Sequence, residues 1–425
     1  MTKLQNIANL LKPYCTEQEI KQFLLCCEDR PVSSLLVNTY FPESLSFLKD
    51  LKHDEEDALL YRFDKETFSL GKSVEHFGGA FYMLDPSSAT ISYYLSPLLK
   101  QNFVSIDLCG APGGKSISLA MRRHDGLYLC NDISYTRAVE IQKNTQRLGL
   151  SNVLSVSMDP VKMDLPAAFD LVILDVPCSG SGMFRKEEKM LDDWSMEKVE
   201  RLLPVQMELL EKSYHLLKKD GIIAYSTCSL SVQEDEEQVE QFLKRHSDME
   251  LIECKIRKDI VKGVKGIGYH MVPGIFDGEG IYFALLRKKG GAEFSFQELK
   301  NKGSSPLTGT KLFAYRKNEY IVSRIYKELI DLPFIAPGVK IHDDSPYPKC
   351  IYDHAYSKVC QDIPKVSIEE SLAKEYIRGN EISLSDSTVK DGLVVLCYLG
   401  YPLGFGKKVK NRIKNYLPKG LRENL

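Results

Sequence analysis

Two cysteines stand just after apolar runs, and each is followed by small polar residues. Cys178 lies in "DLVILDVPCSGSG", residues 170–182, and Cys228 lies in "IIAYSTCSLS", residues 222–231. Apolar runs bounded by turn residues are typical of buried parallel strands. Neighbouring strands of a doubly wound sheet open at their carboxyl ends into one crevice. We therefore expect both thiols, together with Asp175, to face the same substrate.

Two thiols at one site have a specific use in pyrimidine chemistry. Carbon 5 of cytosine is a poor nucleophile, but a thiolate that adds to carbon 6 turns the ring into an enamine, which is covalent catalysis. The adduct must then lose the carbon 5 proton and expel the thiol, so a second group is useful. Asp175 is positioned to hydrogen-bond N3. The alternative is that both cysteines are buried small hydrophobic residues, as we expect of Cys15, Cys26, Cys27 and Cys397.

A glycine-rich loop, "SIDLCGAPGGKSISLA" at residues 105–120, follows an earlier apolar run. Glycines between a strand and a helix let the backbone approach a ligand. "GGKS" resembles the end of a P-loop, but Cys109 stands where that motif needs its first glycine and Pro112 removes an amide. The absence of G-x-G-x-x-G disfavours a nicotinamide dehydrogenase. A P-loop NTPase remains the weaker alternative.

Binding of S-adenosylmethionine fits the loop better. The loop accommodates the methionine part, Asp132 at the end of "LYLCND" takes the ribose hydroxyls, and Asp159 in "VSMD" accepts the adenine amino group. Each aspartate alone fits a turn or a helix cap, but three carboxylates at successive strand ends, counting Asp175, favour a cofactor. The predicted cofactor contacts are Cys109, Gly110, Ala111, Pro112, Gly113, Gly114, Lys115, Asp132, Arg137, Asp159 and Asp175.

The elements that must position these residues alternate along the chain. Strand-like runs at 103–109, 127–132, 153–159, 169–176, 221–226 and 281–287 alternate with helical patterns, which predicts βαβ units around a parallel sheet. We expect an α/β protein with a small N-terminal α/β domain at residues 1–75, the doubly wound domain at 76–290, a linker at 291–305 and a separate C-terminal region at 306–425.

Composition and charge limit the function classes. The 425 residues are 43% hydrophobic, and no long uncharged apolar run or signal-peptide pattern is evident, so we expect a cytoplasmic protein with no membrane partner. Eleven cysteines without framework spacing favour free thiols, and no Cys/His grouping predicts a metal. The net charge of −2 hides a tail, "YPLGFGKKVKNRIKNYLPKGLRENL", with seven cations and one Glu. This tail is either a solvated basic end or a folded surface for a polyanion.

Motifs along nearly the whole chain resemble the Sun family of RNA cytosine-5 methyltransferases, in particular its bacterial RsmF-type members, which act on small-subunit ribosomal RNA. The matching stretches are "RPVSSLLVNTY", "LDPSSA", "LCGAPGGKS", "VPCSGSGMFRK", "YSTCSLSVQEDEE", "GEGIYFALLRK" and "GYPLGFGKKVKNRIKNYLPKGLR". The resemblance implies a class I (Rossmann-like) methyltransferase fold, S-adenosylmethionine as cofactor, Cys228 as nucleophile, Cys178 as the thiol that assists release and Asp175 as the base contact.

The resemblance also implies RNA as the partner, most notably 16S rRNA or the small ribosomal subunit. It implies a PUA-like RNA-binding module at the C-terminus, and we expect a monomer. The predicted RNA contacts are Arg185, Lys186, Lys407, Lys408, Lys410, Arg412, Lys414 and Lys419. Phe184, Arg185 and Lys186 are expected beside cofactor or phosphate. A catalytically idle RNA-binding assembly factor is the alternative, because it would keep the basic tail without needing both thiols.

Overall fold

The computed structural model describes residues 2–41, 45–186, 189–292, 294–299, 305–346, 348–384 and 388–425. Residues 293 and 300–304 of the predicted linker lie outside this part of the chain. The helices are α1 (Lys3–Leu10), α2 (Glu17–Cys26), α3 (Val74–Gly78), α4 (Pro86–Leu95), α5 (Gly114–Arg122), α6 (Tyr135–Leu148), α7 (Lys189–Asp193), α8 (Met196–Leu216), α9 (Glu236–Arg245) and α10 (Glu370–Arg378). Within the described ranges, no helix has the length and apolar character needed to cross a membrane.

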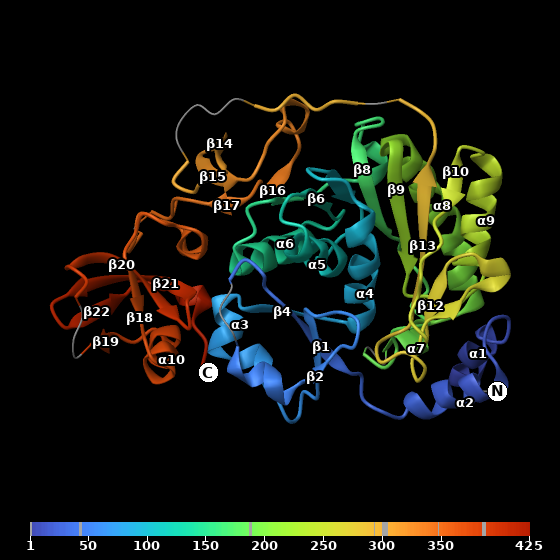
Figure 1. The fold of residues 1–425 in the computed structure, drawn as a ribbon, viewed down its shortest axis with the longest axis horizontal. Coiled ribbons are helices and arrows are strands. Elements are labelled where there is room, and N and C mark those ends of the chain that lie inside the picture. Colours follow the sequence, from blue (N-terminus) through green and yellow to red (C-terminus); the bar gives the residue numbers. More distant parts are fainter. Residues whose placement is uncertain are drawn as a thin grey trace.

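A ten-stranded mixed sheet forms the centre of the molecule (Figure 1). Its strands are β5 (Val104–Asp107), β6 (Leu127–Asn131), β7 (Val153–Val156), β8 (Phe169–Asp175), β9 (Leu217–Thr227), β10 (Met249–Leu251), β11 (Val261–Lys262), β12 (Tyr269–Met271), β13 (Ile281–Lys288) and β16 (Phe334–Ala336). The order is β11-β12-β13-β9-β8-β5-β6-β7-β16, with β10 paired to β13. The strands β7, β6, β5, β8 and β9 are parallel. All six predicted strands of the doubly wound domain are present, five of them parallel as predicted, whereas β13 runs antiparallel to β9.

Side chains of the sheet alternate between two buried faces, as the period-2 geometry of a strand requires. Val172 and Leu174 of β8 join the core on the side of α8 and α9, and Leu171 and Ile173 join the core on the side of α4, α5 and α6. Because both faces are covered, the strands read as near-continuous apolar runs. This double cover leaves only the strand ends free for chemistry.

The N-terminal residues form two separate pieces. A four-stranded antiparallel sheet has the order β2-β3-β1-β4 and contains β1 (Ser33–Val37), β2 (Lys52–His53), β3 (Leu60–Phe63) and β4 (Phe81–Leu84). Helices α1 and α2 instead pack with Phe184, Trp194 and Leu230 beside the main sheet. Since β4 extends this sheet to residue 84, the predicted boundary at 75 falls inside the N-terminal unit.

The C-terminal region is also divided. A three-stranded sheet has the order β14-β15-β17, with β14 (Lys311–Tyr315), β15 (Asn318–Val322) and β17 (Val339–Lys340). A five-stranded sheet has the order β18-β20-β21-β22-β19, with β18 (Lys365–Ser367), β19 (Ile382–Ser383), β20 (Gly392–Tyr398), β21 (Tyr401–Val409) and β22 (Arg412–Asn415). Strand β16 pairs with β7, and Tyr320, Val322 and Phe334 join the main core. The predicted boundary at residue 290 therefore does not mark the end of the main packed unit.

Candidate active site

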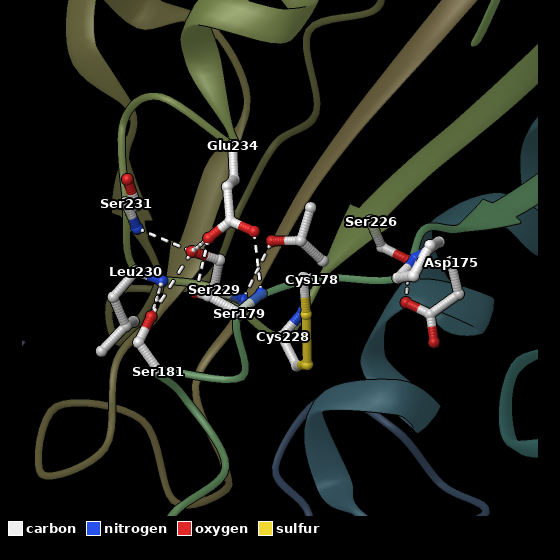
Figure 2. The surroundings of a disulfide bond; sticks show 12 residues. Asp175, Cys178, Ser179, Ser181, Ser226, Cys228, Ser229, Leu230, Ser231 and Glu234 are labelled. Carbon is white, nitrogen blue, oxygen red and sulfur yellow. Dashed lines mark hydrogen bonds between the residues drawn. A yellow bond between two sulfur atoms is a disulfide. The ribbon is translucent and has the colours of Figure 1, made fainter. Parts of the chain in front are cut away.

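The loops that follow β8 and β9 bring Cys178 and Cys228 together. These strands are adjacent and parallel, with Asp175 opposite Ser226 in the register, so both loops leave the sheet at one level. The two Cα atoms are 6.3 Å apart and the sulfur atoms are joined as a disulfide (Figure 2). The thiols meet as predicted. The expectation that all cysteines are free was wrong for this pair, while the other nine are free thiols.

Asp175 sits at the carboxyl end of β8 between a cation and a hydroxyl group. The Lys115 ammonium lies 2.7 Å from Asp175 Oδ2, and Ser226 donates a 2.8 Å hydrogen bond to Asp175 Oδ1. Lys115 is 7% exposed, whereas the Asp175 side chain is 38% exposed. A buried cation thus orients a carboxylate that remains open to the cavity in front of the thiols.

The glycine-rich loop takes its shape from Gly113. This residue has φ of +108°, in the left-handed region, and a Cβ atom there would lie 2.4 Å from the Ile117 side chain. Any other residue would be strained and would clash. Helix α5 begins directly afterwards at Gly114. Arg137 donates a 2.8 Å hydrogen bond to the carbonyl of Ala111, so the loop is held from α6 as well.

A cavity of about 580 Å³ lies where these loops converge. This volume is within the range for small-molecule sites. Its lining includes Cys109, Asp132, Arg137, Asp159, Asp175, Cys178 and Cys228. The predicted cofactor carboxylates and the two thiols therefore share one cavity.

The polar atoms of the cavity fit a ligand that carries hydroxyl groups. Asp132 is 1% exposed and its Oδ1 accepts the Ser134 amide at 2.9 Å. Its Oδ2 lies 3.3 Å from Arg137 and has no hydrogen-bond donor among the described residues, so it is available to a ligand hydroxyl. Asp159 caps the next turn through the Val161 amide. Burial raises the pKa of the Cys109 thiol to about 12, which keeps it protonated and unreactive.

Two acidic residues that the sequence analysis did not select lie just behind the cavity. Asp107, at the end of β5, accepts a hydrogen bond from Ser116 at 2.5 Å, and burial raises its pKa to about 7. Glu234, from the segment before α9, bonds to both cysteine loops (Figure 2). Both residues belong to quoted motifs, "SIDLC" and "SVQEDEE", but a carboxylate directed inward leaves no periodic signal in a single sequence.

A buried group with the residue types of a metal site was also missed. Ligand atoms of Asp235, Glu236 and His270 all lie within 4.8 Å of one another. Glu236 accepts hydrogen bonds from the Val264 amide and from His270, each at 2.8 Å. The sequence spacings that are typical of metal ligands do not reveal this group, because His270 on β12 is far along the chain from Asp235 and Glu236.

The predicted RNA contacts divide into exposed and buried side chains. Lys186, Lys407, Lys410, Arg412, Lys414 and Lys419 are exposed. Arg185 is buried in an ion pair with Glu279 at 3.1 Å, and Lys408 is 6% exposed and 3.3 Å from Asp391. The prediction that these two bind RNA is not supported, because Arg185 is paired with a buried carboxylate and the buried Lys408 is paired with Asp391. Phe184 packs against Phe23 of α2 rather than beside the cofactor cavity.

Three exposed cations of the tail, Lys407, Arg412 and Lys414, share one face of the five-stranded sheet. Lys407 on β21 stands opposite Lys414 on β22, and Val409 stands opposite Arg412. Alternation along the strands turns Lys408 and Ile413 to the buried side. The sequence predicted where the cations lie along the chain. The strand register was needed to show that Lys407, Arg412 and Lys414 face outward and that Lys408 faces inward.

Comparison with known proteins shows which methyltransferases this chain is similar to. Residues 93–287 match the model for the 16S rRNA methyltransferase RsmB/F family, and residues 363–423 match the methyltransferase RsmF PUA domain. The proteins named ribosomal RNA small subunit methyltransferase F from Aeromonas salmonicida and Psychromonas ingrahamii are each 29% identical. They cover 84% and 85% of this chain and 82% and 83% of their own length.

Solved structures agree on the fold. The structure of NSun6 from Pyrococcus horikoshii with SFG has a TM-score of 0.58 and 19% identity, over 67% of this chain and 98% of that one. A methyltransferase homolog protein from the same organism has a TM-score of 0.53 and 25% identity, over 66% and 98%. The two family models thus lie along the chain in order: a methyltransferase domain of the RsmB/F kind comes first, and a PUA domain of the RsmF kind follows.

Proposed function

We propose that this protein transfers a methyl group from S-adenosylmethionine to carbon 5 of a cytosine in 16S rRNA. The observation that carries the proposal is the meeting of Cys178 and Cys228 in the cavity that Asp175 lines. A methyltransferase that acts on an oxygen or on an exocyclic nitrogen has no need for two thiols. Carbon 5 of a pyrimidine does need a thiol, because the ring must first be activated at carbon 6.

In this proposal Cys228 attacks carbon 6 of the cytosine as a thiolate. Asp175 contacts the N3 edge of the ring, and the Lys115 ammonium at 2.7 Å holds that carboxyl group in place and offsets the negative charge that the attack places on the ring. The new S–C6 bond places electron density on carbon 5, which then accepts the methyl group.

Cys178 acts in the second half of the reaction. After methylation, carbon 5 carries both a proton and a methyl group, and the proton must leave while the S–C6 bond breaks. The Cys178 sulfur lies next to Cys228, so it is close to the carbons that react. As a thiolate it takes the carbon 5 proton, the electrons of the C5–H bond re-form the C5–C6 double bond, and the S–C6 bond breaks so that Cys228 departs as a thiolate.

Asp132 and Asp159 hold the cofactor, together with the loop of residues 109–115. Asp132 accepts hydrogen bonds from the ribose hydroxyls through its Oδ2, which lies 3.3 Å from Arg137 and has no hydrogen-bond donor among the described residues, and Asp159 accepts from the adenine amino group. When bound, the cofactor supplies an electrophilic methyl group. The protein supplies the orientation of the ring and a cavity partly screened from water.

The disulfide must be reduced before turnover, since neither sulfur is nucleophilic within it. Two thiols of a reductant give two protein thiols and one reductant disulfide. This requirement fits the cytoplasmic location that we propose.

The outer face of β21 and β22 serves as the RNA-docking surface, and the protein acts as a monomer. The exposed Lys407, Arg412 and Lys414 on this face meet phosphates. The choice of 16S rRNA rests on the two family models and on the names of the relatives.

The test is bisulfite sequencing of 16S rRNA transcripts and small ribosomal subunits incubated with reduced protein and S-adenosylmethionine. We expect one or a few cytosines to become resistant to conversion with the wild-type protein and none with Cys228→Ser. RNA binding without any methylated cytosine in either substrate would instead favour the idle assembly factor.

A further inference from the structure

Glu234 lies at the centre of the contacts that join the two cysteine loops. Its side chain is fully buried, and its two oxygens accept four hydrogen bonds. Oε1 accepts the Ser179 amide at 2.8 Å and the Gln206 side-chain amide at 3.0 Å. Oε2 accepts the hydroxyl groups of Ser179 and Ser229, each at 2.6 Å (Figure 2). A carboxylate has acceptor sites for all four of these bonds at once.

Two of the three residues that bond to the Glu234 side chain directly follow the two thiols. Ser179 follows Cys178, and Ser229 follows Cys228. The neighbouring Asp235 completes the arrangement, because it accepts a 2.5 Å hydrogen bond from Thr227, which directly precedes Cys228. Both cysteine loops are therefore tied to the same short acidic segment.

Within the described ranges, the hydrogen-bond donors to the Glu234 side chain are all neutral: one backbone amide, one side-chain amide and two hydroxyls. Burying a carboxylate without a cation is unfavourable unless several donors satisfy it. Hydrogen bonds to a charged acceptor are also stronger than neutral ones. A loop that moved away would leave the buried charge with fewer donors, so the arrangement resists changes in the separation of the loops.

We propose that Glu234 is the positioning residue that sets the separation of the Cys178 and Cys228 thiols. The proposal rests on the proposed function for its catalytic meaning, but the separation of the thiols is a property of the protein alone. The two steps of the reaction need both sulfurs near the same pair of carbons. When the separation of the loops increases, Cys228 can still attack carbon 6, but Cys178 is too far away to assist release.

The first experiment measures the thiol separation without any methylation. The reduced protein is treated with diamide, whose azo group takes two hydrogens while the Cys178–Cys228 disulfide forms, and the remaining thiols are alkylated and followed by mass spectrometry. We expect Glu234→Ala to slow formation of this disulfide by roughly 10- to 100-fold, the scale of an effect from misplacement by about 1 Å. Glu237→Ala is the matched control, because Glu237 lies three residues further along the chain, in the first turn of α9, and its side chain is exposed.

The conservative variant Glu234→Gln separates positioning from charge. Its carbonyl oxygen can accept from the Ser179 and Gln206 amides while its NH₂ donates to the two hydroxyls, which can reverse their roles. We expect disulfide formation close to the wild-type rate. In methylation assays, Glu234→Ala should lower kcat and leave KM for RNA and for S-adenosylmethionine unchanged, and covalent enzyme–RNA adduct should accumulate.

A folded Glu234→Ala protein that closes the disulfide at the wild-type rate overturns the proposal. If Glu234→Ala does not fold, the double variant Ser179→Ala/Ser229→Ala removes the two hydroxyl contacts and keeps the carboxylate. Unchanged disulfide formation in that variant overturns the proposal equally. If the wild-type protein methylates no RNA but the variants slow disulfide formation, the proposed function fails and the positioning role stands.

Discussion

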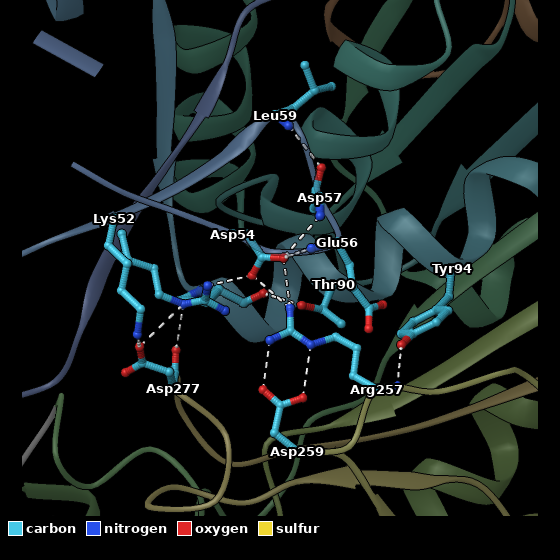
Figure 3. Close-up of polar contacts among 12 residues, drawn as sticks. Lys52, Asp54, Glu56, Asp57, Leu59, Thr90, Tyr94, Arg257, Asp259 and Asp277 are labelled. Carbon is cyan, nitrogen blue, oxygen red and sulfur yellow. Dashed lines mark hydrogen bonds and ion pairs between the residues drawn. The ribbon is translucent and has the colours of Figure 1, made fainter. Parts of the chain in front are cut away.

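Polar residues are arranged in opposite ways in two regions of the molecule. One is the thiol centre, which consists of Cys178, Cys228 and the residues bonded to Glu234, and the other is the outer face of β21 and β22. At the thiol centre, Glu234, Ser179 and Ser229 are fully buried, and each polar side chain has a defined partner. On the outer face, Lys407, Arg412 and Lys414 are exposed, and Arg412 lies 3.8 Å from the exposed Glu381. A second buried network, around Asp54 and Arg257, follows the pattern of the thiol centre: Arg257 pairs with both Asp54 and Asp259 (Figure 3).

This contrast separates two physical tasks. Bond formation at carbon 6 requires atoms placed to within a fraction of an ångström, so the supporting groups are buried and fully hydrogen-bonded. Phosphate binding is long-ranged and tolerates many side-chain arrangements, but it is screened by salt. We therefore expect substitutions at the first region to act on rates, and substitutions at the second to act on affinity and its salt dependence.

The largest expected effect is at Cys228. A serine hydroxyl is far less nucleophilic than a thiolate from a group with an ordinary pKa near 8.5, so Cys228→Ser should abolish methylation and give no covalent adduct. Cys178→Ser should still attack and methylate, but slow release should leave the enzyme attached to RNA. A denaturing gel of each variant with RNA and S-adenosylmethionine, in the presence of reductant, measures both outcomes. Adduct with Cys228→Ser and none with Cys178→Ser would reverse the two assignments.

A smaller loss is expected at Asp132. Its substitution by alanine removes hydrogen bonds to the ribose, which should cost about 1.5–3 kcal/mol of S-adenosylmethionine affinity. Calorimetry on the reduced protein measures this directly. Asp164→Ala is the matched control, because that side chain is 87% exposed and does not line the cavity. Equal affinities of the two variants would show that Asp132 does not hold the cofactor.

On the outer face, the double variant Arg412→Ala/Lys414→Ala should weaken RNA binding and flatten its salt dependence. Each lost phosphate contact reduces the slope of log affinity against log salt by about 0.7–0.9. The control Lys244→Ala/Arg245→Ala removes two exposed cations from α9, at the opposite end of the molecule (Figure 1). Binding titrations at several salt concentrations compare the two. If the control loses as much slope, docking is not specific to β21 and β22.

The smallest effect concerns acid stability where the C-terminal region meets the rest of the protein. His354 lies near Phe77 of α3, and Lys358 donates hydrogen bonds to the carbonyls of Phe77 and Pro402. Burial lowers the pKa of His76 and of His354 to about 3. The unfolded chain takes up these protons near pH 6.5 and the folded protein does not, so the contribution to stability is present above pH 6.5 and is lost as the pH falls toward 3.

His354→Gln should therefore reduce the loss of stability on acidification. The expected difference is up to about 1.4 kcal/mol per pH unit for one histidine. Denaturant unfolding between about pH 7 and pH 5 measures it, with His53→Gln as control, since His53 is exposed on β2. If both variants show the wild-type pH dependence, His354 does not titrate as inferred.

The sequence predicted the main sheet well, because strands covered on both faces form apolar runs that stand out in a single sequence. The positions of Cys228, Asp132 and Asp175 followed from this, since each directly follows or ends such a run, and Cys178 lies three residues beyond the end of β8. The pairing of Lys408 with Asp391 could not be predicted, because it depends on strand register across a hairpin. The role of Glu234 was missed for a similar reason: a buried carboxylate is recognised only by its partners, which come from three separate segments.

Strand β16 closes the edge of the main sheet beside β7, although it comes from far along the chain. During synthesis, the amide and carbonyl groups on one edge of β7 remain unpaired until residues 334–336 have left the ribosome. An exposed strand edge readily pairs with another chain. Cutting the gene at the linker would thus yield a fragment that holds every predicted catalytic and cofactor residue, yet carries a permanently open edge and a tendency to aggregate.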